Sequence, residues 1–332
     1  MYSEQINQRE EWADIFKGIL IFCVVLGHSN YIYSDILYWF SMPLFFMIYG
    51  YFWKDKGKSA LIFLSKKAKH FFIPFVFYFV VLDLIPMIFL EKISLEKVLK
   101  RCFAFVWSGK LYQGVYWFIP TLFLSVCIFY FLRGCFDRRK RIMIMCCMYV
   151  LGVIISIKLV PECVTNIPLY LCLPWNADVC LLTVGYIGFG LFVHEAKGKI
   201  NLNVKVAISA SCLFLSFLFI ILYITNNFSY KMDMKYSMYK SIIFPIILPI
   251  IFGKVLQDIS VVLNNFIISK PLQLLGKASL IVMYIHIPIR KYIFELFRIN
   301  YNPYVYAITC AVIGCCLYLL IQNNKARVIF LG

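Results

Sequence analysis

Apolar stretches of about twenty residues recur along the chain and are separated by short polar segments. A helix needs about 20 apolar residues to cross the hydrocarbon core of a bilayer. The stretches that meet this length are 14–33, 36–53, 70–90, 114–132, 142–160, 172–193, 204–224, 239–258, 272–297 and 303–322. Pro168 and Pro174 interrupt the start of the sixth, which would also suit a re-entrant segment. No internal repeat is visible, so the pattern predicts one all-α membrane domain over residues 1–332, with about ten transmembrane helices.

Composition supports this class. Of the 332 residues, 62% are hydrophobic and 15% are charged, and the mean hydropathy is +0.82. Soluble domains carry about 25% charged residues, so much of the apolar surface must face lipid. The formal net charge of +17 would suggest nucleic acid in a soluble protein. Here the basic residues lie mostly in connecting segments, where they set orientation, and we expect no nucleic-acid partner.

The connecting segments predict which end of the helices faces the cytoplasm. Segments 54–70, 133–141 and 194–205 are rich in lysine or arginine and fall on one side of a ten-helix topology. The positive-inside rule makes this side cytoplasmic, and both termini then lie there as well. Segment 91–110 opposes the trend, because it places five basic residues on the other side.

The first apolar stretch carries three ionisable residues on one helical face. Eleven positions separate Lys17 from His28, which brings them within about 20° of the same face and about 16 Å apart along the axis. Asp14 lies on that face one turn before Lys17. Ionisable groups inside a membrane span are expensive and suggest a functional site. The alternative is a lysine that reaches the membrane surface and a histidine that bonds to a neighbouring helix.

A second histidine is expected at the same depth. His286 lies about fifteen residues into the ninth stretch, and His28 lies about fourteen residues after Asp14. At about 1.5 Å per residue, both imidazoles fall in one layer if the two helices run in the same direction. We therefore expect a site shared by His28 and His286, provided that the first and ninth helices are neighbours.

Other polar and aromatic residues are predicted near this layer. Asp178 begins the apolar part of the sixth stretch, and Arg290 follows His286 by one turn. Trp117, like two other tryptophans, maps near the outer side. It is interpreted either as a membrane-interface aromatic or as a ring that stacks on a sugar.

A basic cluster leads into the third stretch and consists of Lys66, Lys67, Lys69 and His70. A histidine can act as a general base on a hydroxyl or accept an acyl group, and a basic cluster suits a phosphorylated donor. A donor such as acyl-CoA could bind its nucleotide there and extend its thioester inward, while contact with anionic lipid is the alternative. Thirteen cysteines without a CxxC pair, together with only four histidines, predict no metal site.

Several ordered motifs resemble the acyltransferase-3 family of bacterial integral membrane acyltransferases, in particular its fucose 4-O-acetylase-like branch. The basic residue and histidine of the first stretch match the opening of that family. The later matches are FSMPLFFMIYGYFWK (40–54), VYWFIPTLFL (115–124), LPWNADVCLLTVGYIGFGLFV (173–193) and LLGKASLIVMYIHIPI (274–289). They run in order and cover most of the chain.

The resemblance implies a multi-pass protein of the bacterial cytoplasmic membrane that uses cytoplasmic acyl-CoA as a co-substrate, with no permanently bound cofactor. Acetyl-CoA is the default donor. The acceptor is expected to be a sugar hydroxyl of a surface polysaccharide or of its lipid-linked precursor. His28 carries over as the essential residue and Lys17 as its motif partner.

We therefore predict an O-acetyltransferase in which His28 deprotonates the acceptor hydroxyl or relays the acyl group. Lys17 and the 66–70 cluster would hold the phosphates of CoA, and Asp14 would orient Lys17. His286 and Asp178 would position the acceptor or tune His28.

Two other functions are compatible with charged groups inside a membrane. A transporter or flippase of lipid-linked glycans would show inverted repeats, and none is visible. A glycan polymerase would have a large outer loop with arginines, whereas segment 91–113 holds only Arg101. Consumption of acyl-CoA separates the predicted activity from both. The sequence leaves the acyl group, the acceptor, its route across the membrane and the oligomeric state open.

Overall fold

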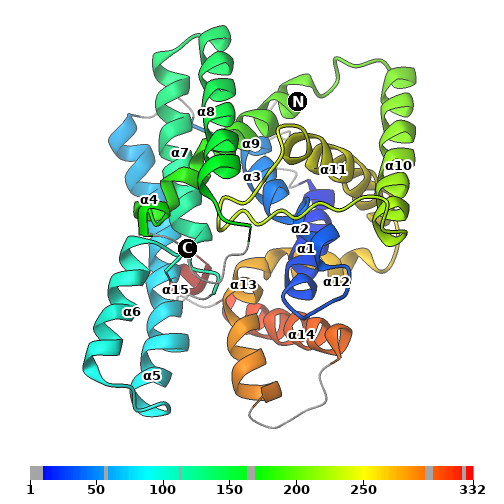
Figure 1. Cartoon of the computed structure of the whole chain (residues 1–332). Helices are drawn as coiled ribbons and strands as arrows, with labels where there is room; N and C mark the ends of the chain where they lie inside the picture. The colour runs from blue at the N-terminus through cyan, green and yellow to red at the C-terminus, as the bar shows by residue number, and fades with distance from the viewer. Residues whose placement is uncertain are drawn as a thin grey trace, which may run out of the picture.

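A computed structural model describes residues 10–55, 59–111, 114–162, 169–295, 302–323 and 327–331, and these ranges are almost entirely helical (Figure 1). The one β-type pairing within them joins Asp233 and Met238. The helical elements are α1 (Glu11–Gly27), α2 (Ser34–Tyr38), α3 (Ser41–Tyr51), α4 (Ala60–Phe79), η1 (Val80–Leu84), α5 (Ile85–Phe89), α6 (Leu95–Trp107), α7 (Phe118–Cys135), α8 (Arg138–Leu159), η2 (Leu169–Leu171), η3 (Pro174–Asn176), α9 (Ala177–Ala196), α10 (Leu202–Ile224), α11 (Phe244–Leu263), α12 (Ser269–Lys277), α13 (Ser279–Ile289), η4 (Arg290–Glu295), α14 (Pro303–Ile321) and α15 (Arg327–Leu331).

Helix length and composition confirm an all-α multi-pass membrane protein. Within the described ranges, seven helices are long and apolar enough to cross a bilayer, and α12 with α13–η4 makes an eighth if this bent pair is one span. The seven are Ala60–Phe89, Phe118–Cys135, Arg138–Leu159, Pro174–Ala196, Leu202–Ile224, Phe244–Leu263 and Pro303–Ile321. Helices α1 and α3 correspond to the first two predicted spans but have only 17 and 11 residues. The total of ten spans therefore stays a prediction.

Two helices differ in their bounds from the apolar stretches that predicted them. Helix α4 begins at Ala60, ten residues before the predicted start, because alanine, leucine and lysine are good helix formers whatever their hydropathy. The 66–70 cluster is therefore part of the helix. Helix α1 ends at Gly27 and does not extend to residue 33. Asn30 adopts a left-handed backbone with φ 58°, which an α-helix cannot continue through.

The ninth apolar stretch is broken. Helices α12 and α13 meet at Ala278 with a bend of 78°. The sixth stretch, where Pro168 and Pro174 suggested a re-entrant piece, starts with the short η3 turn at Pro174 and continues as α9, while Pro168 lies outside the described residues. Trp175 and Asn176 adopt left-handed backbones in that turn.

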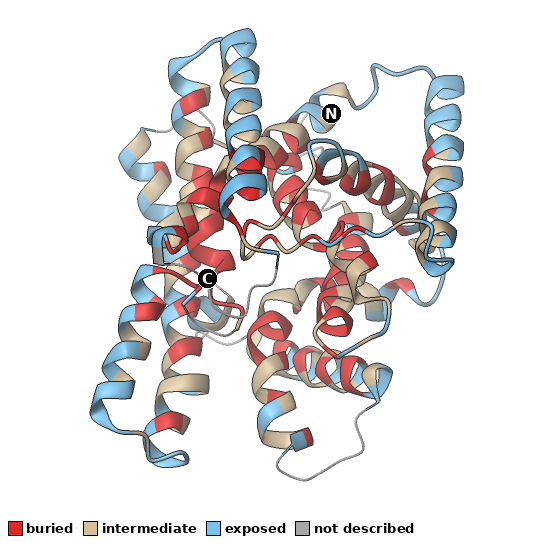
Figure 2. Ribbon diagram, viewed as in Figure 1, coloured by how far each residue is buried: buried red, intermediate tan, exposed pale blue. Residues whose placement is uncertain are grey.

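The eighth stretch also begins later than predicted, at Phe244. The preceding residues 225–243, which we call the strap, connect α10 to α11 by a long detour. In Figure 1 the yellow-green trace of the strap crosses the molecule from α10 toward α8 and returns to α11. Figure 2 shows that much of this trace is buried, and Tyr230, Met232, Met234 and Tyr239 are its buried apolar anchors.

Glycines permit two close helix contacts that position the site. A Cβ on Gly276 of α12 would lie 1.8 Å from the backbone oxygen of Asp14 in α1, and one on Gly190 of α9 would lie 1.9 Å from that of Met47 in α3. Small residues allow such backbone approach in membrane proteins. Helices α8 and α10, by contrast, bury few residues and show long exposed faces in Figure 2, as expected for lipid contact.

Candidate active site

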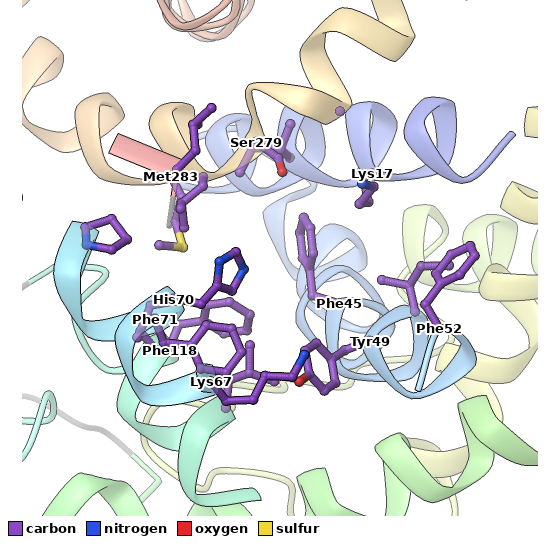
Figure 3. Close-up of a pocket in the computed structure, with 18 of the residues that line it drawn as sticks. Lys17, Phe45, Tyr49, Phe52, Lys67, His70, Phe71, Phe118, Ser279 and Met283 are labelled. Atoms are coloured by element: carbon purple, nitrogen blue, oxygen red, sulfur yellow. The ribbon is translucent and has the colours of Figure 1, made fainter. Parts of the chain in front are cut away.

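One pocket opens between α1 and α13 on one side and α3, α4 and α7 on the other (Figure 3). Its volume is about 460 Å³. Lys17 of α1 and Ser279 of α13 face Tyr49 of α3 and His70 of α4 across it. Leu331 of α15 closes part of the wall, and Phe330 beside it packs against the ring of Phe77 in α4, with 4.6 Å between centroids.

Four lysines of the pocket wall come from elements far apart in sequence and are Lys17, Lys54, Lys67 and Lys277. We call this part of the pocket the basic end, whereas His70 lies beside Met283 (Figure 3). Lys67 lies over the ring of Tyr49, 5.1 Å from its centroid, and the Tyr49 hydroxyl has no hydrogen-bond partner among the described residues. Ser279 also lines the pocket. It is the first residue of α13, and the N-terminus of a helix carries partial positive charge. The basic end can bind phosphate groups.

Lys17 is held at the basic end by Asp14, as the sequence predicts. The Lys17 ammonium lies 2.7 Å from a carboxylate oxygen of Asp14, whose side chain is 4% exposed, whereas that of Lys17 is 28% exposed. A buried carboxylate requires such a partner. The pair therefore keeps the ammonium directed at the pocket.

Apolar side chains line the rest of the pocket, which comes within one helical turn of two histidines that do not themselves line it. Val24 and Met283 line it. Val24 is one turn before His28, whose backbone N–H donates to its oxygen, and Met283 is one turn before His286. The pocket therefore extends from the lysines to residues one helical turn before each histidine.

The rings of His28 and His286 are neighbours, with centroids 5.3 Å apart. This confirms the expectation that α1 and the helix of the ninth stretch bring them together at one depth. His286 is fully buried, and His28 is half-buried. The Tyr306 hydroxyl donates to the backbone oxygen of His286 at 2.7 Å, which fixes this part of α13 against α14.

Hydrogen bonds assign the hydrogen on each neutral ring. His286 Nδ1 lies 3.2 Å from the backbone oxygen of Val282. Because a carbonyl only accepts, Nδ1 carries the hydrogen and Nε2 keeps a lone pair. That Nε2 is buried and has no hydrogen-bond partner among the described residues. This nitrogen can therefore accept a proton, or accept a hydrogen bond from a donor group of a ligand.

The same reasoning applies to His28. The Tyr38 hydroxyl donates its single hydrogen to the Gly27 oxygen at 2.7 Å, and His28 Nδ1 lies 3.5 Å from the same hydroxyl. The Tyr38 oxygen must accept in that contact, so His28 Nδ1 carries the hydrogen and Nε2 is the basic atom. A ring nitrogen oriented this way suits general-base chemistry.

Arg290 belongs to this site, as the sequence predicts. Its Nη1 donates to the backbone oxygen of His28 at 3.1 Å, and its Nε pairs with Glu295 at 3.2 Å. Arg290 opens the π-helical segment η4, a distortion that occurs frequently at functional sites. The guanidinium therefore fixes the end of α1 against the end of α13.

Asp178 lies in a cluster of buried polar side chains. Its buried carboxylate pairs with the Lys110 ammonium and accepts from the Ser237 hydroxyl. Lys110 also donates to the Leu171 oxygen at 3.0 Å. The polar partners of Asp178 are thus Lys110 and Ser237, and its place in the histidine layer stays a prediction. The sequence offered no reason to pair residue 178 with a lysine 68 positions earlier.

Three further predicted residues have no place in the pocket. Lys66 and Lys69 are exposed and lie outside its lining, whereas Lys67 and His70 of the same helix line it. Trp117 is 7% exposed, and Gly109 packs so closely on it that an added Cβ would lie 2.3 Å from the Trp117 Cα. Because the residue is buried, its ring has no free face for a sugar in this structure.

Sequence reasoning missed four residues of the site. Lys277 and Ser279 line the pocket. Both lie in the LGKAS part of the 274–289 segment that resembles the family, so that motif could have indicated them. Tyr49 lies in the MPLFFMIYG segment. Tyr38 had no signal, because its contact with His28 depends on the turn after α1.

Comparison with known families adds an independent finding. The model of a family described as an acyltransferase domain, the acyltransferase-3 family, matches residues 10–321. The match includes the pocket residues of α1, α3, α4, α7 and α13. It is to the family as a whole, so membership of the fucose 4-O-acetylase-like branch stays a prediction. A comparison with curated proteins found no match to this chain.

Proposed function

Because the chain belongs to the acyltransferase-3 family, we propose that this membrane acyltransferase is an O-acyltransferase, by default an O-acetyltransferase. Its donor would be cytoplasmic acyl-CoA. Its acceptor would be a sugar hydroxyl of a surface polysaccharide or of its lipid-linked precursor. The observation that carries the proposal is a pocket that is lined by lysines from several elements and comes within one helical turn of two facing histidines.

The basic end is suited to the nucleotide part of acyl-CoA. Lys17, Lys67 and Lys277 come from three helices and can surround phosphate oxygens, and charge-assisted hydrogen bonds to phosphate are strong. The narrow pantetheine arm would pass between Phe45 of α3 and Met283 of α13. The thioester would then stop below the histidines.

The histidine pair would supply the acid–base chemistry. His28 Nε2 removes the proton of the acceptor hydroxyl, whose oxygen attacks the thioester carbonyl carbon. Collapse of the tetrahedral species breaks the carbon–sulfur bond, and the proton on His28 passes to the leaving sulfur. His286 Nε2, buried beside it, would orient the acceptor hydroxyl or share its proton.

Wild-type protein in lipid nanodiscs tests this function. Acetyl-CoA labelled in its acetyl group would be incubated with lipid-linked and polysaccharide acceptors extracted from the host, and free CoA thiol would be measured in parallel. We expect label in the acceptor and one thiol released for each acetyl group transferred. Absence of both label transfer and acetyl-CoA binding would contradict the proposal.

The same assay decides the acyl group. Acetyl-, succinyl- and longer acyl-CoA would be supplied in turn at equal concentration. We expect the highest kcat/KM for acetyl-CoA, and a preference for a longer acyl group would revise the donor while leaving the reaction class intact.

A further inference from the structure

A short helix carries the tyrosine that orients His28. Helix α2 has five residues, Ser34–Tyr38, and so short a helix is marginally stable by itself. Its position therefore depends on contacts with other elements. The hydroxyl of Tyr38, its last residue, lies 2.7 Å from the Gly27 oxygen and 3.5 Å from Nδ1 of His28. Whatever fixes α2 also fixes the oxygen that accepts from the His28 N–H.

The contact between Tyr38 and His28 is sensitive to the position of α2. Tyr38 packs closely on the end of α1, since an added Cβ on Gly27 would lie 3.1 Å from its ring. The centroids of the Tyr38 and His28 rings are 5.8 Å apart. The 3.5 Å contact with Nδ1 is at the outer limit of hydrogen-bond length. A small shift of α2 along α1 would therefore break it.

One turn before Tyr38, Asp35 links α2 to the end of α10. Residues three apart on a helix are neighbours, so Asp35 and Tyr38 lie along one side of α2. The Tyr223 hydroxyl donates to the Asp35 carboxylate at 2.9 Å, although the two residues are 188 positions apart in the chain. A hydrogen bond to an ionised acceptor is stronger than one between neutral groups. This bond is therefore suited to hold α2 in place.

Trp39 fixes the C-terminal end of α2. It is fully buried, and its indole N–H donates to the Tyr230 oxygen of the strap at 2.9 Å. Its ring packs edge-on against the rings of Tyr223 and Phe228, with 5.4 and 5.6 Å between centroids. Tyr223 thus contacts this end of the molecule twice, through Asp35 and through Trp39.

We propose that Asp35 and Tyr223 are positioning residues for the general base. Their hydrogen bond holds α2 where the Tyr38 oxygen accepts from Nδ1 of His28. The lone pair on Nε2 is then free to take the proton of the acceptor hydroxyl. This role rests on the proposed function, in which His28 is the base. The pocket that would bind the donor is not lined by either residue, so both act through Tyr38 and not on the donor.

The chemical reason for such a device is the tautomer of the imidazole. A neutral ring can carry its hydrogen on either nitrogen, and the hydrogen bond made by one nitrogen decides which. A ring with the hydrogen on Nε2 could not accept the acceptor's proton there. Loss of the Asp35–Tyr223 hydrogen bond would therefore lower the fraction of protein in which His28 is a competent base, while the pocket stays unchanged.

Removal of one hydroxyl tests the proposal. Tyr223→Phe removes the donor and keeps the ring that packs on Trp39. We expect kcat for acetyl transfer to fall by about tenfold, a part of the roughly 100-fold or more that a general base contributes. KM for acetyl-CoA should stay the same. Asp35→Ala should behave alike, whereas Asp35→Asn, which keeps a carbonyl acceptor, should retain most of the activity.

Tyr149→Phe is the matched control. Its hydroxyl, like that of Tyr223, belongs to a half-buried tyrosine and donates to another element, here the Ile242 oxygen. The variant loses a hydrogen bond of the same kind, but on α8. Its kcat should equal that of the wild type.

A double-mutant cycle shows whether Tyr223 acts through Tyr38. Tyr38→Phe removes the oxygen that accepts from His28, so we expect kcat to fall by about tenfold or more. If Tyr223 only places this oxygen, Tyr223→Phe should lower kcat no further in the Tyr38→Phe background. Residues that act independently would instead multiply their effects.

The tautomer of His28 gives a readout that does not depend on catalysis. The chain has only four histidines, so isotope-labelled histidine gives few ring-nitrogen signals by NMR in nanodiscs, and His28→Ala identifies the signals of residue 28. The wild type and Tyr149→Phe should show the hydrogen on Nδ1. Tyr223→Phe should show a mixture of both tautomers.

Three results would overturn the proposal. With an active wild type, these are an unchanged kcat in Tyr223→Phe, or effects of Tyr223→Phe and Tyr38→Phe that multiply. The third is a His28 tautomer that Tyr223→Phe leaves unaltered, whatever the activity. A wild type that transfers no acyl group would refute the proposed function, and the tautomer measurement would still decide whether Tyr223 positions His28.

Discussion

At the scale of single residues, each histidine of the site has one ring nitrogen fixed by its own surroundings. Val282 holds Nδ1 of His286, and Tyr38 holds Nδ1 of His28. Both Nε2 atoms therefore keep lone pairs in the neutral rings. Two adjacent bases in an apolar layer favour a reaction that moves a proton and then returns it, as acyl transfer from a thioester does.

Individual lysines at the basic end should contribute to donor binding. Lys67→Ala and Lys277→Ala are each expected to raise KM for acyl-CoA by about tenfold, because a hydrogen bond to a charged group is worth about 1.5 kcal/mol or more. The value of kcat should change little, since the phosphates lie far from the reacting carbon. Steady-state kinetics in nanodiscs measures both constants.

Lys66→Ala provides the control for this experiment, because Lys66 is exposed on the same helix and lies outside the pocket lining. Its KM should equal that of the wild type. Equal increases in KM for Lys66→Ala and Lys67→Ala would show that general surface charge, and not the pocket, binds the donor.

At the scale of helices, α1 carries most of the site. Asp14, Lys17, Val24 and His28 follow one another along it, and α12 and α13 pack against it. The contact with α12 depends on Gly18, where an added Cβ would lie 2.3 Å from the Leu272 oxygen, and on Gly276. Any widening of this contact would move the lysine and the histidine relative to α13.

Gly276→Ala should therefore destabilise the fold. The added methyl would meet the backbone of Asp14 at 1.8 Å, and overpacking of this kind costs about 2 kcal/mol. Gly185→Ala on α9, where nothing lies within 4 Å, should be neutral or slightly stabilising, since alanine is the better helix former. Thermal unfolding in detergent compares the two. Similar midpoints would contradict the close packing of α1 on α12.

Helical periodicity within one stretch predicted the part of the site that is local in sequence. It placed Asp14, Lys17 and His28 on one face, and counting along two helices placed His286 at the depth of His28. Contacts between distant segments were not predictable. The strap lacks an apolar stretch of spanning length, so its buried course was missed, and only tertiary packing selects Lys67 over Lys66 for the pocket.

At the scale of the whole molecule, the pocket runs from its basic end toward the histidine pair, and the positive-inside rule predicts that the basic end faces the cytoplasm. The proposed donor, acyl-CoA, is a cytoplasmic metabolite, so the predicted orientation would present it at the correct side. The acceptor would approach from the opposite side. The orientation can be tested separately from the chemistry.

An epitope inserted after Gly198, between α9 and α10, should be reached by antibody only after the cells are permeabilised. One inserted after Lys92, between α5 and α6, should be reached in intact spheroplasts. These two sites lie at turns, where insertions are tolerated. The reverse pattern of labelling would place the basic end outside and would exclude cytoplasmic acyl-CoA as the donor.

The most direct test of the central claim is to measure acetyl-CoA binding and acetyl transfer on one variant, His28→Ala, in nanodiscs. The account predicts that the variant binds acetyl-CoA with the affinity of the wild type and transfers at least about 100-fold more slowly, as expected for loss of a general base. His194→Ala, whose ring contacts Tyr51 far from the pair, should transfer at the wild-type rate. Full transfer by His28→Ala would contradict the claim that the histidine pair is where the acyl group is transferred.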